Sequence, residues 1–95
     1  MINHMIFESN GQEIDLKKIT RLYPAVLIQA GGERASVSLE WAEMKADQIT
    51  VEAYLLVCDV DPVGEVPLNR IELRYETKEA LFRAMEEVAE RFKGL

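Results

Sequence analysis

The segment TKEALFRAMEEVAERFKGL, residues 77–95, decides the fold because it is the clearest amphipathic helix in the chain. Its apolar residues recur at the i, i+4, i+7 and i+11 positions of one helix face, namely Leu81, Met85, Val88 and Phe92. Thr77 is a suitable N-cap, since its hydroxyl can accept from unpaired amides of the first turn, and Gly94 suits the C-terminal end. The pattern predicts a helix over residues 77–93 that packs against the rest of the chain.

Upstream of this helix, apolar and polar residues alternate in short runs that predict five to six antiparallel strands. The runs lie at residues 3–8, 12–16, 25–30, 34–43, 49–60 and 70–75. Asn10-Gly11 and Gly31-Gly32 separate neighbouring runs, and both dipeptides readily take the positive φ values of a hairpin turn. The cleanest alternation has the apolar face Ala35, Val37, Leu39 and Trp41. It predicts a strand that is buried on one side.

The segment Asp15–Tyr23 admits two interpretations. Leu16, Ile19 and Leu22 have helical spacing, and the aspartate at the start of the segment can cap a single turn. Pro24 disfavours a helical conformation in the residue before it, so any helix here is short. We expect a strand that runs into a brief turn, with a helix as the alternative.

These elements predict an α+β domain that spans residues 1–95, with a curled antiparallel meander of strands packed against one C-terminal helix. The order of elements resembles that of the pleckstrin-homology-like domains, in which a bent sheet, here a possible half-barrel, is capped by a C-terminal helix. The lipid-binding members of that family carry Lys and Arg in the first hairpin loop, and the loop here, Ser9–Gln12, has neither. The resemblance therefore implies a fold and no phosphoinositide site.

The strand expected at residues 49–60 is apolar on both faces towards its C-terminal half, so we expect it to be central and covered on both sides. One helix of about 17 residues is roughly 25 Å long and covers only part of such a sheet. Three arrangements can cover the remainder. The sheet curls over its own core, it packs on a second copy, or its open face binds a partner or ligand.

The charge balance argues against nucleic-acid and membrane-surface partners. The chain carries 17 acidic and 11 basic residues, whereas contacts with phosphates need clustered Lys and Arg. The one short basic cluster, Lys17, Lys18 and Arg21 with Arg34, is interpreted as solvated surface. The chain also shows no secretory signal or membrane span, and its single cysteine excludes an intrachain disulfide. We therefore expect a cytoplasmic protein.

No constellation of residues predicts an enzyme, a cofactor or a metal. Cys58 and the single histidine, His4, are the only nucleophile–base pair to consider, and an inert core cysteine is the stronger interpretation. Two such residues are also too few for a zinc site. Asp59–Glu65 matches an EF-hand calcium loop at the first, third and sixth positions but lacks ligands at the fifth and twelfth. We expect a plain acidic turn.

We expect a small non-enzymatic interaction module that forms a homodimer through its sheet. The residues nominated for an interface or ligand site are Trp41, Tyr54, Leu56 and Tyr75. Aromatic side chains with a polar end are frequent at interfaces, although core packing is the other interpretation of the tryptophan. A monomeric module that binds a peptide or a small apolar ligand is the alternative. An acidic antagonist of a basic protein, of the immunity or anti-restriction type, is a further alternative that rests on the net charge of −6.

Overall fold

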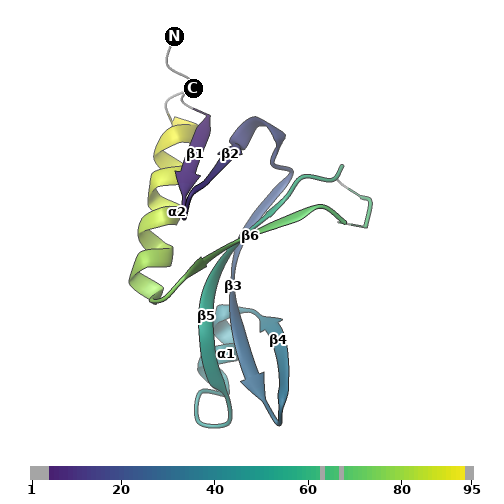
Figure 1. The fold of residues 1–95 in the computed structure, drawn as a ribbon, viewed down its shortest axis with the longest axis vertical. Helices are drawn as coiled ribbons and strands as arrows, with labels where there is room; N and C mark the ends of the chain where they lie inside the picture. Colours follow the sequence, from purple (N-terminus) through teal and green to yellow (C-terminus); the bar gives the residue numbers. More distant parts are fainter. Residues whose placement is uncertain (1–4, 63, 67, 94–95) are drawn as a thin grey trace.

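The computed structural model describes residues 5–62, 64–66 and 68–93, and it has two antiparallel sheets (Figure 1). The smaller sheet is a hairpin of β1 (Ile6–Ser9) and β2 (Gln12–Asp15). The larger sheet consists, in spatial order, of β4 (Glu33–Val37), β3 (Arg21–Ala30), β5 (Thr50–Asp59) and β6 (Arg70–Tyr75). The helices are the 3₁₀ turn η1 (Leu16–Lys18), α1 (Leu39–Met44) and α2 (Lys78–Lys93). The predicted α+β class is confirmed, and the sheet does not close into a barrel.

The C-terminal helix forms as its sequence predicts. The Thr77 hydroxyl accepts from the Ala80 amide at 3.1 Å, so Thr77 caps the helix and α2 begins one residue later. Lys78 forms an ion pair with Glu43 and thereby connects α2 to α1. The expected C-terminal glycine, Gly94, lies outside the described residues, as does His4 in the expected first strand.

Both predicted hairpin turns are present. Asn10 and Gly11 have φ values of 54° and 78°, and Gly31 and Gly32 have 58° and 84°, which are the left-handed values that these residue types tolerate best. The ambiguous segment after β2 has a feature of each interpretation. The Asp15 carboxylate accepts from the Lys17 amide at 3.0 Å and caps a single 3₁₀ turn, as the helical alternative expected, but this turn is brief and lies between two strands. The chain then enters β3 at Arg21.

The expected strand over residues 34–43 is wrong beyond Val37. Ser38 ends the strand, because its hydroxyl accepts from the Trp41 amide at 3.1 Å and caps α1. Leu39 and Ala42 then face the core with helical spacing. The alternation was misleading because Leu39 fits both the two-residue repeat of a strand and the spacing of a helix. Trp41, which the strand pattern placed on the apolar face, is instead 39% exposed.

The larger sheet departs from a simple meander, because β5 pairs with β3 and leaves β4 at an edge. β4 pairs with Val26–Ala30 of β3, and β6 pairs with Tyr54–Asp59 of β5. Among the described residues, no strand therefore pairs with the first half of β3 on the β4 side. Pro24 lies in this half, where its missing amide is tolerated because the strand is locally an edge.

One face of the larger sheet carries the main core. α2 and the β1–β2 hairpin cover its β5–β6 half, whereas α1 covers its β3–β4 half at the other end of the molecule (Figure 1). Leu39 and Tyr54 pack against both clusters, which places both helices on the same face. β5 is the central strand, as predicted, and Leu55, Leu56, Val57 and Cys58 are each at most 1% exposed.

Candidate functional site

Three of the four residues nominated from the sequence lie on the face that the helices cover. Tyr54 and Tyr75 are cross-strand partners on β5 and β6, and Leu56 beside them is 0% exposed. Desolvation raises the pKa of the Tyr75 hydroxyl, which shares a 2.7 Å hydrogen bond with Ser9. Trp41 lies on α1 and is partly exposed. The structure therefore does not unite the four residues in one surface.

The opposite face of the larger sheet is the candidate site. Its buried centre, Ala25, Leu55 and Val57, is contributed by β3 and β5 alone, and no helix of the described residues joins that cluster. Tyr23 and Leu27 are partly buried beside it. Leu55 and Val57 are only 1% exposed, and the partly buried side chains that pack against their cluster come from β3. We refer to this surface as the open face.

A column of alternating charge runs along β6 at one side of the open face. Arg70 lies opposite Asp59, Glu72 opposite Val57, and Arg74 opposite Leu55. Glu76, one residue beyond β6, continues the alternation and lines the same hollow as Arg74. We call Arg70, Glu72, Arg74 and Glu76 the charge column.

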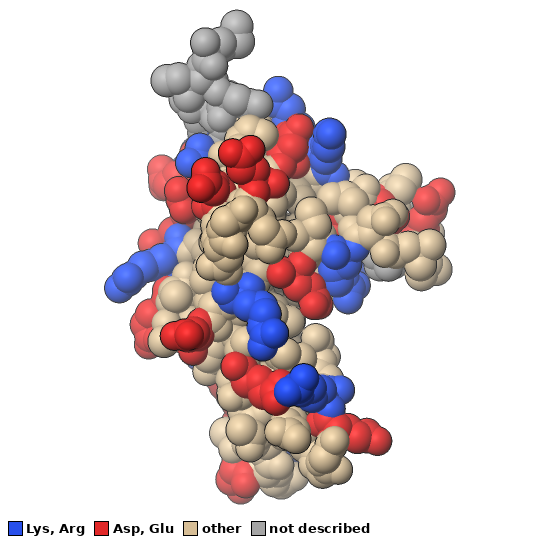
Figure 2. Space-filling model, in the orientation of Figure 1, with Lys and Arg blue, Asp and Glu red and all other residues tan. Residues whose placement is uncertain are grey.

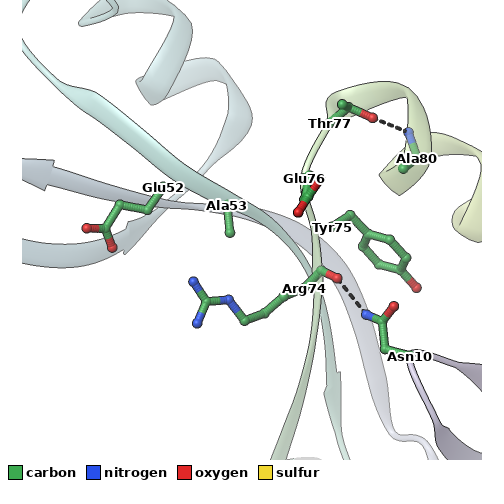
Figure 3. A pocket seen from close by; sticks show the side chains of 8 residues that line it. All are labelled: Asn10, Glu52, Ala53, Arg74, Tyr75, Glu76, Thr77 and Ala80. Atoms are coloured by element: carbon green, nitrogen blue, oxygen red, sulfur yellow. Dashed lines mark hydrogen bonds between the residues drawn. The ribbon is translucent and has the colours of Figure 1, made fainter.

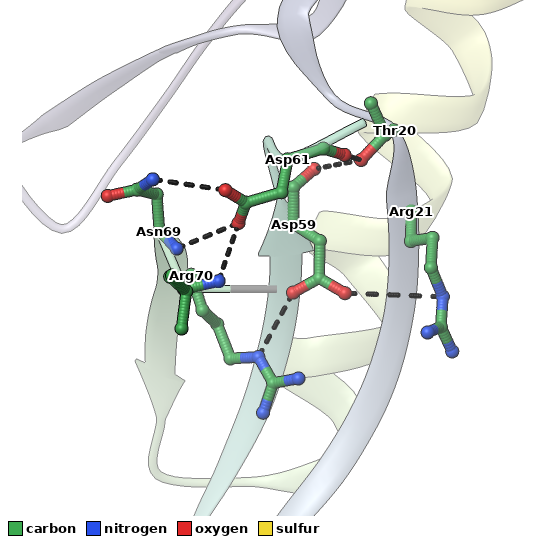
Figure 4. A network of polar contacts seen from close by, with 7 residues as sticks. Thr20, Arg21, Asp59, Asp61, Asn69 and Arg70 are labelled. Carbon is green, nitrogen blue, oxygen red and sulfur yellow. Dashed lines mark hydrogen bonds and ion pairs between the residues drawn. The ribbon is translucent and has the colours of Figure 1, made fainter. Parts of the chain in front are cut away.

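At one end of the open face, a buried carboxylate is held between two arginines (Figure 4). Asp59 is 1% exposed, and its Oδ1 accepts from Nε of Arg70 at 3.0 Å. Its Oδ2 has no hydrogen-bond partner among the residues that the structure describes, and it lies 4.0 Å from Nε of Arg21. The bond to Asp59 raises the pKa of the Arg70 guanidinium above its ordinary value. A buried charge paired in this way fixes both side chains relative to the sheet.

The ring of Tyr23 lies beneath the same two arginines. The guanidinium carbon of Arg21 is 5.3 Å from the ring centroid, and that of Arg70 is 5.8 Å away. Both distances fall within the range of a cation–π interaction. Tyr23 is therefore held on the open face by contacts with two cations that are themselves held by Asp59.

Two shallow hollows flank the buried centre of the open face. The smaller has a volume of about 220 Å³ and lies beside the unpaired half of β3, among Tyr23, Pro24, Val57, Arg70 and Glu72. The larger, about 640 Å³, lies where β6 meets α2 (Figure 3). Figure 3 shows the Arg74 side chain extending across this larger hollow in the direction of Glu52. Glu52 itself pairs with Arg34 of β4, with 3.0 Å between Nε and Oε2.

Asp61 organises the described part of the loop after β5. Its carboxylate accepts from the amides of Leu68 and Asn69 at 2.8 Å and from the Asn69 side chain at 3.0 Å. These hydrogen bonds lower the pKa of Asp61, and the bond from the Asn69 backbone amide has the largest effect. Asp59, the other aspartate of the calcium-like sequence, points instead to the two arginines. No group of three or more potential ligands in the described residues could hold a metal ion.

Cys58 is a buried core residue. Burial, with a smaller effect from the charge of Asp59, raises the pKa of its thiol to about 11, so the thiol is protonated at neutral pH and is a poor nucleophile. Of the basic cluster considered from the sequence, Arg34 lies far from the other three members. Arg34 pairs across from Gln29, eight residues along β3 from Arg21, which corresponds to about 26 Å of strand.

Comparison of the chain with protein-family models, with curated proteins and with solved structures finds no match. Within the described residues, no helix is long and apolar enough to cross a membrane. The functional assignment therefore rests on the geometry of the open face.

Sequence reasoning missed the cluster of Asp59, Arg21 and Arg70 around Tyr23. Each residue is visible in the sequence as a polar or aromatic residue at a strand end, but only the strand register places them side by side. The charged face of the last strand was the available signal, because Arg70, Glu72 and Arg74 alternate with apolar residues.

Proposed function

We propose that this protein is a non-enzymatic interaction module that self-associates through its open face. The observation that carries the proposal is that no helix in the described part of the chain joins the apolar centre of Ala25, Leu55 and Val57 or the partly buried Tyr23 and Leu27 beside it. In antiparallel sheets an uncovered face is usually polar, since it meets water. Here its middle is apolar, as it is in sheets that pack on another layer.

The molecular surface is larger than that of a compact monomer of this mass. The chain exposes 6588 Å², whereas a compact monomer of 10.8 kDa exposes about 5,500 Å². Its radius of gyration is 14.5 Å, compared with about 12 Å for a compact domain of this length. The excess surface, about 1,000 Å², belongs to an elongated molecule with extents of 49 × 30 × 22 Å, and it provides enough area for a standard protein–protein interface, to which each partner contributes roughly 800 Å².

A second copy is a better occupant than an added peptide strand or a basic protein. Pro24 interrupts the amide groups on the unpaired half of β3, and a proline at an edge disfavours strand addition. A basic partner requires a field of negative charge. On the side of the molecule that Figure 2 shows, Lys and Arg are interspersed with Asp and Glu rather than separated from them.

The experiment is a comparison of molar mass by sedimentation equilibrium across concentrations up to the hundred-micromolar range. Leu27→Glu places a charge on the open face, and Phe92→Glu is the matched control on α2, where the phenylalanine is 42% exposed. We expect dimers for the wild type and the control and a monomer for Leu27→Glu, with unchanged circular dichroism in all three. A wild-type mass of one chain throughout would refute the proposal.

A further inference from the structure

The charge column has the pattern of a surface that pairs with itself. Its signs run plus, minus, plus, minus from Arg70 to Glu76, and successive members are about 7 Å apart along the strand. Within the described residues, no ion pair engages Glu72, Arg74 or Glu76, whereas Arg70 is held by Asp59. When a row of four alternating charges is laid against a second copy that runs in the opposite direction, every charge meets one of the opposite sign.

We infer that two copies pack open face to open face about a two-fold axis that crosses β6 between Glu72 and Arg74, perpendicular to the strands. This inference rests on the proposed self-association and specifies its geometry. The axis places Glu72 of each copy against Arg74 of the other, and Arg70 of each against Glu76 of the other. An interface of this isologous kind requires a self-complementary patch.

The strand register extends this match to the apolar centre. Glu72 pairs with Val57 and Arg74 pairs with Leu55, so the same axis crosses β5 between Leu55 and Val57. Leu55 of one copy then faces Val57 of the other. On β3, the axis falls between Tyr23 and Ala25, which pair with those two residues. Ala25 therefore faces Tyr23 of the second copy, and apolar side chains oppose apolar side chains across the middle of the interface.

Two other placements of the axis bring like charges together, and an axis between Arg70 and Glu72 or between Arg74 and Glu76 opposes only two of the four members to opposite charges. An axis that runs along β6 sets each member of the charge column against the same residue of the second copy. An axis that crosses β6 at Glu72 sets that carboxylate against itself and Arg70 against Arg74. Opposed like charges at an interface select against such arrangements. The axis between Glu72 and Arg74 avoids all of these repulsive contacts.

Charge reversals at the two central positions test this geometry. Glu72→Arg and Arg74→Glu each create two symmetric like-charge contacts, so we expect each to raise the dimer dissociation constant by about 10- to 100-fold. The double variant Glu72→Arg/Arg74→Glu restores opposite signs at both contacts and should dimerise like the wild type. Glu86→Arg, an exposed charge reversal on α2, is the matched control and should have no effect.

Mixing the two single variants provides an independent readout. A copy with Glu72→Arg and a copy with Arg74→Glu oppose arginines to glutamates at both central contacts, so the mixture should form a heterodimer more tightly than either variant forms a homodimer. A wild-type monomer would refute self-association and the axis together. A wild-type dimer that Leu27→Glu disrupts, but that neither reversal weakens or the double variant fails to restore, would refute the axis alone.

Discussion

The buried carboxylate of Asp59 leads to an asymmetric prediction about its two ion-pair partners. Removing the arginine of the 3.0 Å pair, by Arg70→Met, should destabilise the protein more than removing the acid, by Asp59→Asn. The reason is exposure. Asp59 is 1% exposed, whereas the side chain of Arg70 is 38% exposed and that of Arg21 is 63% exposed. Each substitution breaks the same bond, but only the loss of the arginine leaves a charge that water cannot reach.

The magnitudes follow from this geometry. After Arg70→Met, the Asp59 carboxylate retains only Arg21 at 4.0 Å, and a buried charge deprived of its partner costs about 3–5 kcal/mol. Because solvent already reaches part of Arg70, we take the lower end, about 3 kcal/mol. Asp59→Asn leaves two solvated arginines and loses one charge-assisted hydrogen bond, about 1.5 kcal/mol. A domain of 95 residues unfolds with roughly 5–14 kcal/mol, so both effects are measurable.

The assay is urea unfolding of the two single variants and the double variant Asp59→Asn/Arg70→Met, at two protein concentrations so that dimer dissociation is separated from unfolding. The double variant has no unpaired buried charge, so we expect it to be more stable than Arg70→Met alone. The melting temperature should fall by about 4–8 °C per kcal/mol. An Asp59→Asn variant that is less stable than Arg70→Met, or additive single effects, would refute the reasoning.

Three further substitutions and reactions test single features of the fold. The pKa of Asp61 is lowered in the folded protein, so the stability that its carboxylate contributes is complete above the ordinary pKa of 3.8 and is lost as the pH falls through the lower folded pKa. Asp61→Asn should therefore flatten the acid side of a curve of stability against pH. An unchanged curve would contradict this expectation. Native Cys58, with a pKa of about 11, should resist iodoacetamide at neutral pH until the protein unfolds, whereas rapid labelling would show an accessible thiolate. Ser38→Ala should remove the cap of α1 and about 1 kcal/mol of stability in urea unfolding, and no loss would mean that the hydroxyl contributes nothing there.

Local features of the fold could be predicted from the sequence, and pairings between distant strands could not. Asn10-Gly11 and Gly31-Gly32 form their hairpin turns through the conformations of two adjacent residues, and the apolar face of α2 repeats along one segment. Both turns and the helix could therefore be predicted. The segment after Val37 failed because Leu39 and Ala42 have helical spacing while Leu39 also continues the alternation of the strand. The pairing of β5 with β3 instead of β4 depends on contacts that no local pattern contains.

The candidate site could likewise be predicted only in part. An uncovered face of the sheet was expected, but the nominated residues Tyr54, Leu56 and Tyr75 lie on the face that α2 covers. Both faces of β5 are apolar, so the pattern of that strand cannot distinguish the covered face from the open one. The distinction is visible only on β6, where Arg70, Glu72 and Arg74 mark the open side.

The exposure of the open face determines what kind of association it can support. Leu55 and Val57 are already 1% exposed in a single copy, so covering them with a partner removes little further apolar surface from water. A partner therefore gains most of its newly buried surface from Tyr23, Leu27 and the charge column around them. Such contacts fix register and specificity more than they add affinity, and they weaken in salt because the charges are exposed. We therefore expect a dimer whose dissociation constant rises with ionic strength in the wild type and in the double variant Glu72→Arg/Arg74→Glu to the same degree. A salt-independent dimer would show that the apolar centre, rather than the charge column, holds the two copies together.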